Sequence, residues 1–346
     1  MTENTKGILV NPKQVTKRLL SVLANRAKDV IVSRYGLGTN QNKMTLESIG
    51  KKYGITRERV RQIENYSLAN IRKSKEYAKE KKAFDDLKAY ISKLGSVIGE
   101  QDILNHISKD KTTQNNALFL LVVGEEFKKE KEDDEFKHRW YIDGKLADRV
   151  HESLRKLYSN LKDDDIVPEG DMISAFLDHL KEVSEDYKND EVVRRWLSLS
   201  KKIGKNSLGE WGKSKSSNIN AKGMRDYAFL VIRKHGSPIH FREVASSIEK
   251  IFEKKAHVAT THNELIKDPR FVLVGRGLYA LAEWGYMSGV VKDVIRKILE
   301  KEGPLTKEQV IDRVLKERYV KENTILVNLQ NPKHFKKDKQ NKYGIA

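Results

Sequence analysis

The sequence predicts a mainly α-helical protein, in which an N-terminal helix-turn-helix domain is followed by tandem small winged-helix-like domains with short β-hairpins. The chain has 346 residues, enough for two or more domains. Charged residues make up 34% of it, which favours many small helical units with large solvated faces. Trp140, Trp211 and Trp284 are 71 and 73 residues apart, and this spacing indicates a repeated unit.

The helix-turn-helix is predicted between Thr45 and Arg72. Thr45 and Thr56 are the expected N-caps of its two helices, and Gly54 can adopt the left-handed conformation that ends the first helix. Gly50 leaves room for the second helix to cross closely. Apolar residues recur at helical spacing, as Leu46, Ile49 and Tyr53 in the first helix and Val60, Ile63, Leu68 and Ile71 in the second. Ile55 is expected to fill the corner between them.

The outer face of the second helix carries residue types that can recognise bases. Arg pairs with guanine, Gln with adenine, and Glu accepts from cytosine. The residues on this face are Arg57, Glu58, Arg61, Gln62 and Asn65, while Arg59 and Arg72 are expected to contact phosphates. Arg57 and Arg61 have like charges one turn apart, which suggests an external anion. The alternative is an ordinary solvated helix face.

The basic charge is concentrated at the two ends of the chain. The net charge is +18, and residues 1–82 hold 19 Lys and Arg against 7 Asp and Glu, a net charge of +12. Residues 83–222 have a net charge of −3 (24 against 27), and residues 223–346 one of +9 (24 against 15). A polyanionic partner is therefore expected at the ends rather than in the middle. For the C-terminal part, a generally lysine-rich surface is an equal alternative.

The stretch RAKDVIVSRYGLG, followed by TLESIGKKYGITRERVRQIENYSLANIRK, closely resembles region 4 of the sigma-70 family of transcription initiation factors. The resemblance covers roughly Asn25 to Lys75. It implies that the second helix reads the −35 element of a promoter in double-stranded DNA, and that the domain contacts the β flap of core RNA polymerase. By position, Arg57, Glu58 and Gln62 would meet base edges, Arg61 the backbone, and Arg59 and Lys52 phosphates; Thr45 and Thr56 complete the predicted DNA-binding set.

The resemblance does not extend to a region that melts the −10 element. Only about 24 residues precede the match, and they contain no Trp, Phe or Tyr. They are predicted to form one helix over Lys13 to Leu23. The chain is therefore not expected to start transcription by itself.

Four later segments share one predicted plan, in which an amphipathic helix, a breaker, two further helices and a hairpin follow one another, as in a winged helix. The first helices are Phe84 to Leu94, Val150 to Leu161, Met224 to His235 and Val290 to Glu302; the second helices are Gln101 to Ile107, Asp171 to Leu180, Phe241 to Phe252 and Thr306 to Arg318. The hairpins are Phe136 to Ile142, Leu208 to Trp211, Phe271 to Leu281 and His334 to Ile345. The plan fits the second segment least well.

The third segment resembles the HARE-HTH domain, a winged helix-turn-helix found in the delta subunit of bacterial RNA polymerase. The stretches that carry this resemblance are MRDYAFLVIRKHGSPIHFREVASSI and HNELIKDPRFVLVGRGLYALAEWG. Gly275 and Gly277 fit a tight hairpin turn. Arg276, at its tip, is a candidate contact to DNA or polymerase. The delta subunit has an acidic tail, whereas this chain ends with basic residues: Lys333, Lys336, Lys337, Lys339 and Lys342.

The predicted domains are 1–82 (helix-turn-helix with an N-terminal helix and a helical extension), 83–145 (winged-helix-like), 146–212 (degenerate winged-helix-like), 213–222 (linker), 223–286 (HARE-type winged helix) and 287–346 (a second HARE-like winged helix). The stretch Lys201 to Lys222 is rich in Lys, Ser, Gly and Asn and is predicted to be a flexible tether. Glu125 to Glu135 is expected to be a solvated loop.

We expect no enzyme, cofactor, metal or small-molecule ligand. The chain has no cysteine, which excludes disulfides and thiolate ligands, and no phosphate-binding glycine loop or serine elbow. His257 and His262 are more simply packing or capping residues than metal ligands, and Asp163 to Asp165 more simply a solvated turn than a calcium loop. No stretch approaches the roughly 18 apolar residues of a membrane span, and no signal peptide is expected.

The sequence therefore predicts a cytoplasmic, nucleoid-associated transcription protein that binds DNA. Three alternatives stay open. The first is a polymerase-associated interaction protein that reads no bases. The second is the DNA-recognition subunit of a restriction or other defence system. The third is a divergent sigma factor whose missing parts come from another chain.

Overall fold

The computed structural model describes residues 10–180 and 187–346, and it confirms a mainly helical protein with small antiparallel sheets. The chain forms two compact units. Unit 1 comprises residues up to 163 together with 167–204, and unit 2 comprises residues 164–166 together with 205–346. The first nine residues of the predicted domain 1–82 lie outside the described residues.

Unit 1 begins with the helices of the predicted helix-turn-helix region. The helices are α1 (Pro12–Leu20), α2 (Asn25–Tyr35), α3 (Leu46–Tyr53), α4 (Arg57–Arg72) and α5 (Lys75–Lys79). It continues with α6 (Lys81–Lys93), β1 (Val97–Gly99), α7 (Glu100–Ile107), α8 (Lys111–Val123), β2 (Lys128–Glu130) and β3 (Arg139–Tyr141). It ends with α9 (Gly144–Asn160), α10 (Glu169–His179), α11 (Asp190–Leu199) and most of β4 (Ile203–Lys205).

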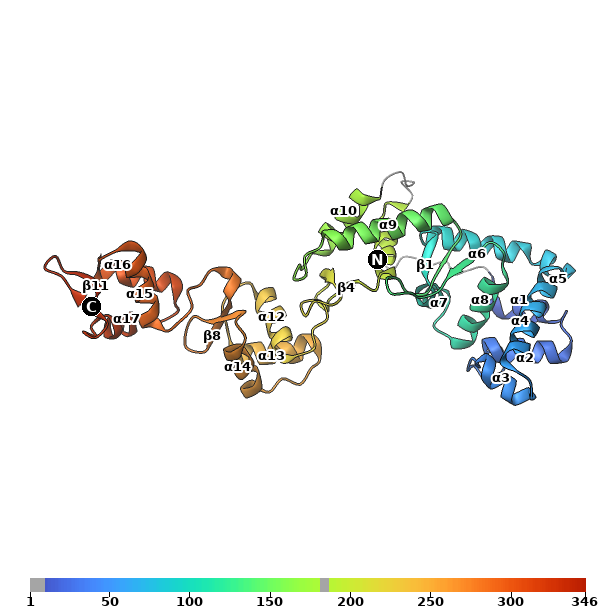
Figure 1. The fold of residues 1–346 in the computed structure, drawn as a ribbon, viewed down its shortest axis with the longest axis horizontal. Coiled ribbons are helices and arrows are strands. Elements are labelled where there is room, and N and C mark those ends of the chain that lie inside the picture. The colour runs from blue at the N-terminus through green and yellow to red at the C-terminus, as the bar shows by residue number, and fades with distance from the viewer. Residues whose placement is uncertain (1–9, 181–186) are drawn as a thin grey trace. The chain divides into compact units, whose positions relative to one another are not determined.

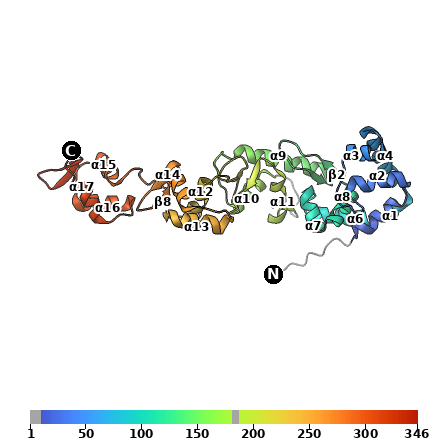
Figure 2. The same cartoon turned by 90° about the horizontal axis from the view of Figure 1, so that it is seen from below.

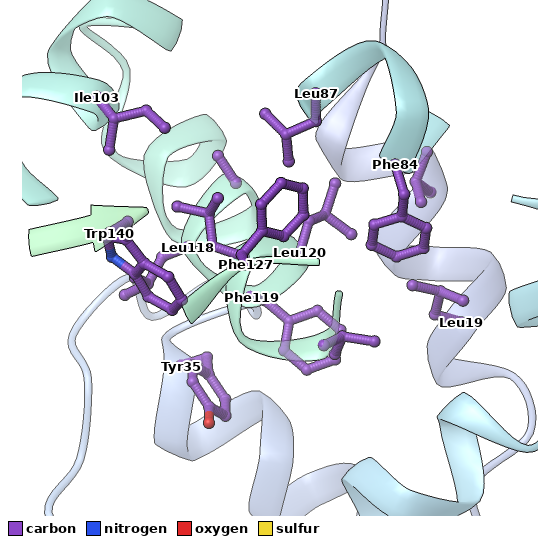
Figure 3. Packing of buried hydrophobic residues seen from close by; sticks show 14 of the residues in the cluster. Leu19, Tyr35, Phe84, Leu87, Ile103, Leu118, Phe119, Leu120, Phe127 and Trp140 are labelled. Carbon is purple, nitrogen blue, oxygen red and sulfur yellow. The ribbon is translucent and has the colours of Figure 1, made fainter. Parts of the chain in front are cut away.

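One hydrophobic core joins the first two predicted domains of the chain. Side chains of α1, α2 and α4 are buried against α6, α8 and the sheet that contains β3, and Figure 3 shows part of this packing around Phe119. The ring of Phe119 lies edge-on to that of Tyr35, with 5.4 Å between the ring centroids. The core thus runs without interruption across the predicted boundary between residues 82 and 83.

Unit 2 contains two segments that share the order helix, strand, helix, helix, strand, strand; the first also has a strand before these elements and a 3₁₀ turn after them. The first has β5 (Trp211–Lys213), α12 (Met224–His235), β6 (Ile239–His240), α13 (Phe241–Phe252), α14 (Val258–Lys267), β7 (Phe271–Leu273), β8 (Leu278–Leu281) and a 3₁₀ turn at Ala282–Trp284. The second has α15 (Val291–Glu302), β9 (Leu305–Thr306), α16 (Lys307–Glu317), α17 (Glu322–Leu329), β10 (Phe335–Lys337) and β11 (Lys342–Ile345). Figure 1 shows both segments.

Three segments share one sheet topology. In each, the last strand lies in the middle of a three-stranded sheet, between the strand that follows the first helix and the strand that precedes it in the hairpin. The strand orders are β1-β3-β2, β6-β8-β7 and β10-β11-β9, and every pairing in these sheets is antiparallel. A helix–strand–helix–helix–strand–strand unit therefore occurs three times. The remaining segment contains α9, α10 and α11.

The prediction of a flexible tether over Lys201 to Lys222, with its linker at 213–222, is wrong. Residues 211–213 form a strand, and Ser216, Asn218 and Ile219 are buried. Asn206 Nδ2 donates to the backbone oxygen of Asn218 at 3.2 Å, and Asn218 Nδ2 donates to that of Asp164 at 3.1 Å. The Asn and Ser residues, whose composition is typical of a linker, thus satisfy buried backbone groups, which orders residues 205–222 within unit 2.

Candidate nucleic-acid interface

The helix-turn-helix is formed by α3, a glycine turn and α4, and both views place these helices beside α2 (Figures 1 and 2). Thr45 Oγ1 accepts from the backbone N–H of Ser48 at 3.1 Å, and Thr56 Oγ1 accepts from that of Arg59 at 3.2 Å. Both predicted N-caps are therefore confirmed. Gly54 ends α3 with a left-handed φ of 66°, also as predicted.

The atom nearest to Gly50 belongs to the turn at Ile55, whereas the sequence analysis expected Gly50 to leave room for the second helix. A Cβ at this position would lie 2.6 Å from the carbonyl oxygen of Ile55, so the turn itself needs the glycine. The backbone N–H of Ile55 donates to the carbonyl of Gly50 at 3.0 Å, which draws the turn onto α3. Gly50 therefore fixes the angle at which α4 leaves the turn.

Two apolar clusters hold α4. Val30, Ile49 and Val60 are each fully buried where α2, α3 and α4 meet, and Ile55 and Ile63 pack around them. Farther along α4, Leu68 and Ile71 belong to the larger core of unit 1. The predicted inward face of the helix is therefore confirmed, and its N-terminal turns project from the domain with their other face in solvent.

The exposed face of α4 holds Arg57, Glu58, Arg59, Arg61 and Gln62. Arg61 donates two hydrogen bonds to the carboxylate of Glu58, and Arg59 donates to Gln62 Oε1 at 3.1 Å. The hydrogen bond from Arg61 lowers the pKa of Glu58 below its ordinary value. The expected repulsion between Arg57 and Arg61 is therefore relieved by Glu58, and it gives no argument for an external anion.

Arg57 differs from the other charged residues of this face. Its side chain has no hydrogen-bond or ion-pair partner among residues 10–180 and 187–346. It occupies the first position of α4, where the free backbone N–H groups and the helix dipole also favour negative charge. The N-terminal end of α4 thus presents an unpaired guanidinium to solvent.

A buried polar contact that the sequence reasoning missed fixes α4 against α2. Tyr35 Oη donates to Glu64 Oε1 at 2.8 Å, and Arg34 Nε lies 3.4 Å from the same oxygen. Burial and the neighbouring carboxylate raise the pKa of Tyr35 above its ordinary value. The feature of the sequence that could have indicated this contact is Glu64, a charged residue four positions after Val60 on the inward face of the helix.

The comparisons with known proteins agree with this geometry. The family model for sigma-70, region 4 matches residues 19–73. Residues 19–73 form a sigma-70 region 4 domain. The RNA polymerase sigma factor RpoS of Coxiella burnetii is 46% identical over 56 residues, which are 16% of this chain and 16% of that protein. SigA1 of Synechococcus elongatus is 48% identical over 54 residues (16% and 13%), and RpoD of Helicobacter pylori 43% over 60 residues (17% and 9%).

The similarity is confined to this domain. The matched stretches cover at most 16% of the length of these sigma factors. The comparisons therefore support a sigma-70 region 4 domain at residues 19–73, and they say nothing of the rest of the chain. The other elements of the chain lie outside the match.

The guanidinium of Arg72, which the sequence analysis expected to contact phosphate, is bonded within the protein. Its guanidinium donates to the backbone oxygens of Val122 and Val123 at 2.8 and 2.9 Å, at the C-terminal end of α8. Asn115 of α8 donates to the backbone oxygens of Gly36 and Gln41 at 3.0 and 2.9 Å. The surface formed by α1, α2 and the end of α4 is thus covered by α8.

An open groove of about 730 Å³ lies on the exposed side of the region 4 domain. Ala24, Ala27, Ile55, Ile63 and Tyr66 supply its apolar lining, and Arg26, Arg59 and Gln62 its polar part. Tyr66 is 69% exposed, an unusual value for a tyrosine. The groove is open, so it offers a partner an apolar surface beside α4.

The remaining predicted contacts lie at separate places. Lys52 is exposed on α3, with Nζ 5.1 Å from the centre of the Tyr53 ring. Arg276 is exposed in the turn between β7 and β8 of unit 2, outside the region 4 domain. In that turn Gly277 has a left-handed φ of 75°. Gly275 lies close to the backbone of Tyr319, and a Cβ at Gly275 would be 2.8 Å from the Tyr319 carbonyl oxygen.

Of the two histidines set aside in the sequence, His262 packs within the domain, where its ring stacks on Phe241 with 4.1 Å between centroids. His257 stands at the N-cap position of α14, but its side chain is exposed and makes no capping hydrogen bond. Among the residues that the structure describes, no group of three His, Asp or Glu side chains is arranged to hold a metal ion. In the same part of the chain, every helix is too short or too polar to cross a lipid bilayer.

Proposed function

We propose that this protein reads a −35-type promoter element by placing the N-terminal end of α4 in the major groove, and that it acts during transcription initiation. The observation that carries the proposal is the unpaired Arg57 at the start of a helix whose opposite face is buried. Arginine is suited to guanine O6 and N7, and the N-terminal end of a recognition helix enters the groove. Glu58 and Gln62 supply the other base-reading types, and Lys52 contacts phosphate.

Binding of the full chain to a −35-containing duplex tests base reading. Arg57→Ala or Gln62→Ala should weaken binding by about 1–3 kcal/mol and relax the preference at one base pair. Lys52→Ala should weaken binding to every duplex alike, because a phosphate contact carries no sequence information. Lys73→Ala, an exposed change near the other end of α4, is the matched control. If Arg57→Ala leaves the affinity for every duplex unaltered, base reading is wrong.

A second function, docking on core RNA polymerase, is favoured by the apolar groove beside α4. The resemblance to sigma factors names the β flap as the partner. Ala27→Glu and Tyr66→Ala should reduce copurification of polymerase from a nuclease-treated lysate, because they place charge in the groove or remove its most exposed ring. Asn70→Ala, also exposed on α4, is the control. Unchanged copurification with both variants excludes this groove as the contact.

The repeated segments are proposed to be winged helices that extend the contact along DNA or onto polymerase. Their shared strand order supports this, and the third segment resembles the HARE-HTH domain, with Arg276 as its candidate contact. The proposed location is the cytoplasm, at the nucleoid. Association of the purified chain with a nuclease, without polymerase, would instead support the restriction or defence role.

A further inference from the structure

The last hairpin of the chain has a cluster of lysines without acidic partners. Lys333, Lys336, Lys337 and Lys339 are exposed, and Lys342 is partly exposed. Within the described residues, none of the five side chains forms an ion pair; Lys337 Nζ lies 5.8 Å from the centre of the Tyr343 ring. In Figures 1 and 2 the hairpin of β10 and β11 extends away from the helices of its segment.

The acidic residue of this hairpin, Asp338, is used by the turn. Its Oδ1 accepts from the backbone N–H groups of Gln340 at 2.8 Å and Lys342 at 2.9 Å. The backbone N–H of Asp338 also donates to the Lys342 carbonyl at 2.8 Å. The carboxylate thus orders the turn that displays the lysines, and it forms no ion pair with them.

The equivalent hairpins of the other segments have a different charge. Residues 128–141 contain five Lys and Arg and five Asp and Glu, so the hairpin has no net charge, and two of its basic residues form ion pairs: Lys129 contacts Glu100, and Arg139 contacts Glu130 and Asp133. Residues 271–281 contain one charged side chain, Arg276. The strand order is the same in all three, so the fold does not require the lysines.

We propose that the β10–β11 hairpin binds the phosphates of duplex DNA independently of sequence. Lysine is a compact, flexible point charge that binds phosphate without recognising bases. Duplex DNA is the favoured polyanion because the same chain carries a region 4 domain, and to this extent the inference rests on the proposed function. Two linked DNA contacts raise the effective concentration of each, so the hairpin strengthens binding without selecting the site.

The test compares two double variants of the full chain with equal loss of charge. Lys336→Gln with Lys337→Gln changes the lysine hairpin, and Lys128→Gln with Lys131→Gln changes exposed lysines of the equivalent neutral hairpin. Dissociation constants for a labelled duplex without a −35-type element are measured over a range of KCl concentrations. A plot of log affinity against log salt has a negative slope. For the first variant this slope should become shallower by about 1.8, because each lost phosphate contact removes about 0.9 from its magnitude. It should not change for the second.

Equal slopes for the two double variants would overturn the proposal, because only the net charge would then matter. The same measurement with single-stranded RNA gives a second check: a loss confined to RNA would assign the hairpin to RNA instead. Arg57→Ala separates this inference from the proposed function. If region 4 reads no bases, that change leaves sequence preference intact, while the slope difference between the two hairpin variants still reports on the lysines.

Discussion

Arg61 donates two hydrogen bonds to the carboxylate of Glu58, from Nε at 2.9 Å and from Nη2 at 2.6 Å. The two side chains lie one turn apart on the exposed face of α4, and both are more than half exposed. The pair neutralises one of the exposed arginines of α4 and restricts the rotation of the Glu58 side chain. In the proposed function, Glu58 would both limit general attraction to phosphate and accept from a cytosine.

Replacement of Glu58 should make binding tighter and less selective. Glu58→Gln removes a negative charge and releases Arg61 to a phosphate, so the affinity for any duplex should rise and the salt slope should steepen by about 0.9. Discrimination at one cytosine should fall at the same time. Fluorescence anisotropy over a salt series measures both effects. Glu47→Gln, an exposed change of equal charge on α3, is the control; the same slope for both variants would exclude a specific role for the pair.

Arg72 should stabilise the protein rather than bind DNA. Arg72→Ala removes both hydrogen bonds to the end of α8, and the free energy of unfolding should fall by about 2 to 3 kcal/mol in denaturant titrations. The salt slope of duplex binding should stay at its wild-type value. Lys73→Ala, an exposed neighbour, should change neither quantity. A lower salt slope with unchanged stability would instead assign Arg72 to phosphate, as the sequence had suggested.

His151 should make unit 1 sensitive to mild acid. It is buried, and its Nε2 accepts from Arg139 Nε at 2.8 Å. Burial, and then the charge of Arg139, lower the pKa of His151 to about 4, from 6.5 for the unfolded chain. The unfolded state therefore binds more protons between these values, and stability falls as the pH drops through this window. From pH 7.5 to 5.0 the loss from this group should be about 2 kcal/mol.

The measurement is the pH dependence of urea unfolding for wild type and His151→Gln. Glutamine offers Arg139 an acceptor that does not titrate, so the variant should lack this part of the acid sensitivity. His138→Gln, at a less buried histidine in the same hairpin, controls for loss of a histidine. A pH profile that is unchanged in His151→Gln would mean that folding does not lower the pKa of His151.

Local signals in the sequence were sufficient to predict the region 4 domain. Thr45, Gly54 and Thr56 each specify a helix end through their own side chain or backbone, and the spacing of Ile49 and Val60 specifies the buried face. The conformation of each depends on only a few neighbouring residues. The residues on the exposed face could be identified for the same reason.

Contacts between distant residues could not be predicted in this way. Asn115 reaches carbonyls of residues 36 and 41, and Arg72 reaches those of 122 and 123, so neither side chain shows its role in the local pattern. These pairings join the two stretches, 10–82 and 83–145, that share one hydrophobic core. The prediction of a flexible tether was wrong for a related reason: asparagine is common in linkers, but Asn206 and Asn218 are buried.

Gly277 should contribute more to the stability of unit 2 than its backbone conformation alone requires. Gly277 and Gly236 have nearly equal left-handed φ values, 75° and 74°. A Cβ at Gly277 would lie 2.5 Å from His240 Nε2 and 3.0 Å from the ring of Phe241, whereas Gly236 has open space around it. Gly236→Ala should therefore lower the free energy of unfolding by about 1–2 kcal/mol, from the backbone alone.

Gly277→Ala adds crowding to that backbone effect, and it should lower the free energy of unfolding by a further 1–3 kcal/mol or so. The crowding is hard to relieve because the neighbouring rings are constrained: Phe241 stacks between His240 and His262, with 4.4 and 4.1 Å between ring centroids. Hydrogen exchange of the α12–α14 amides measures the effect within unit 2. Equal losses for the two alanine variants would show that the rings move aside freely, and that the hairpin turn is not held against α13.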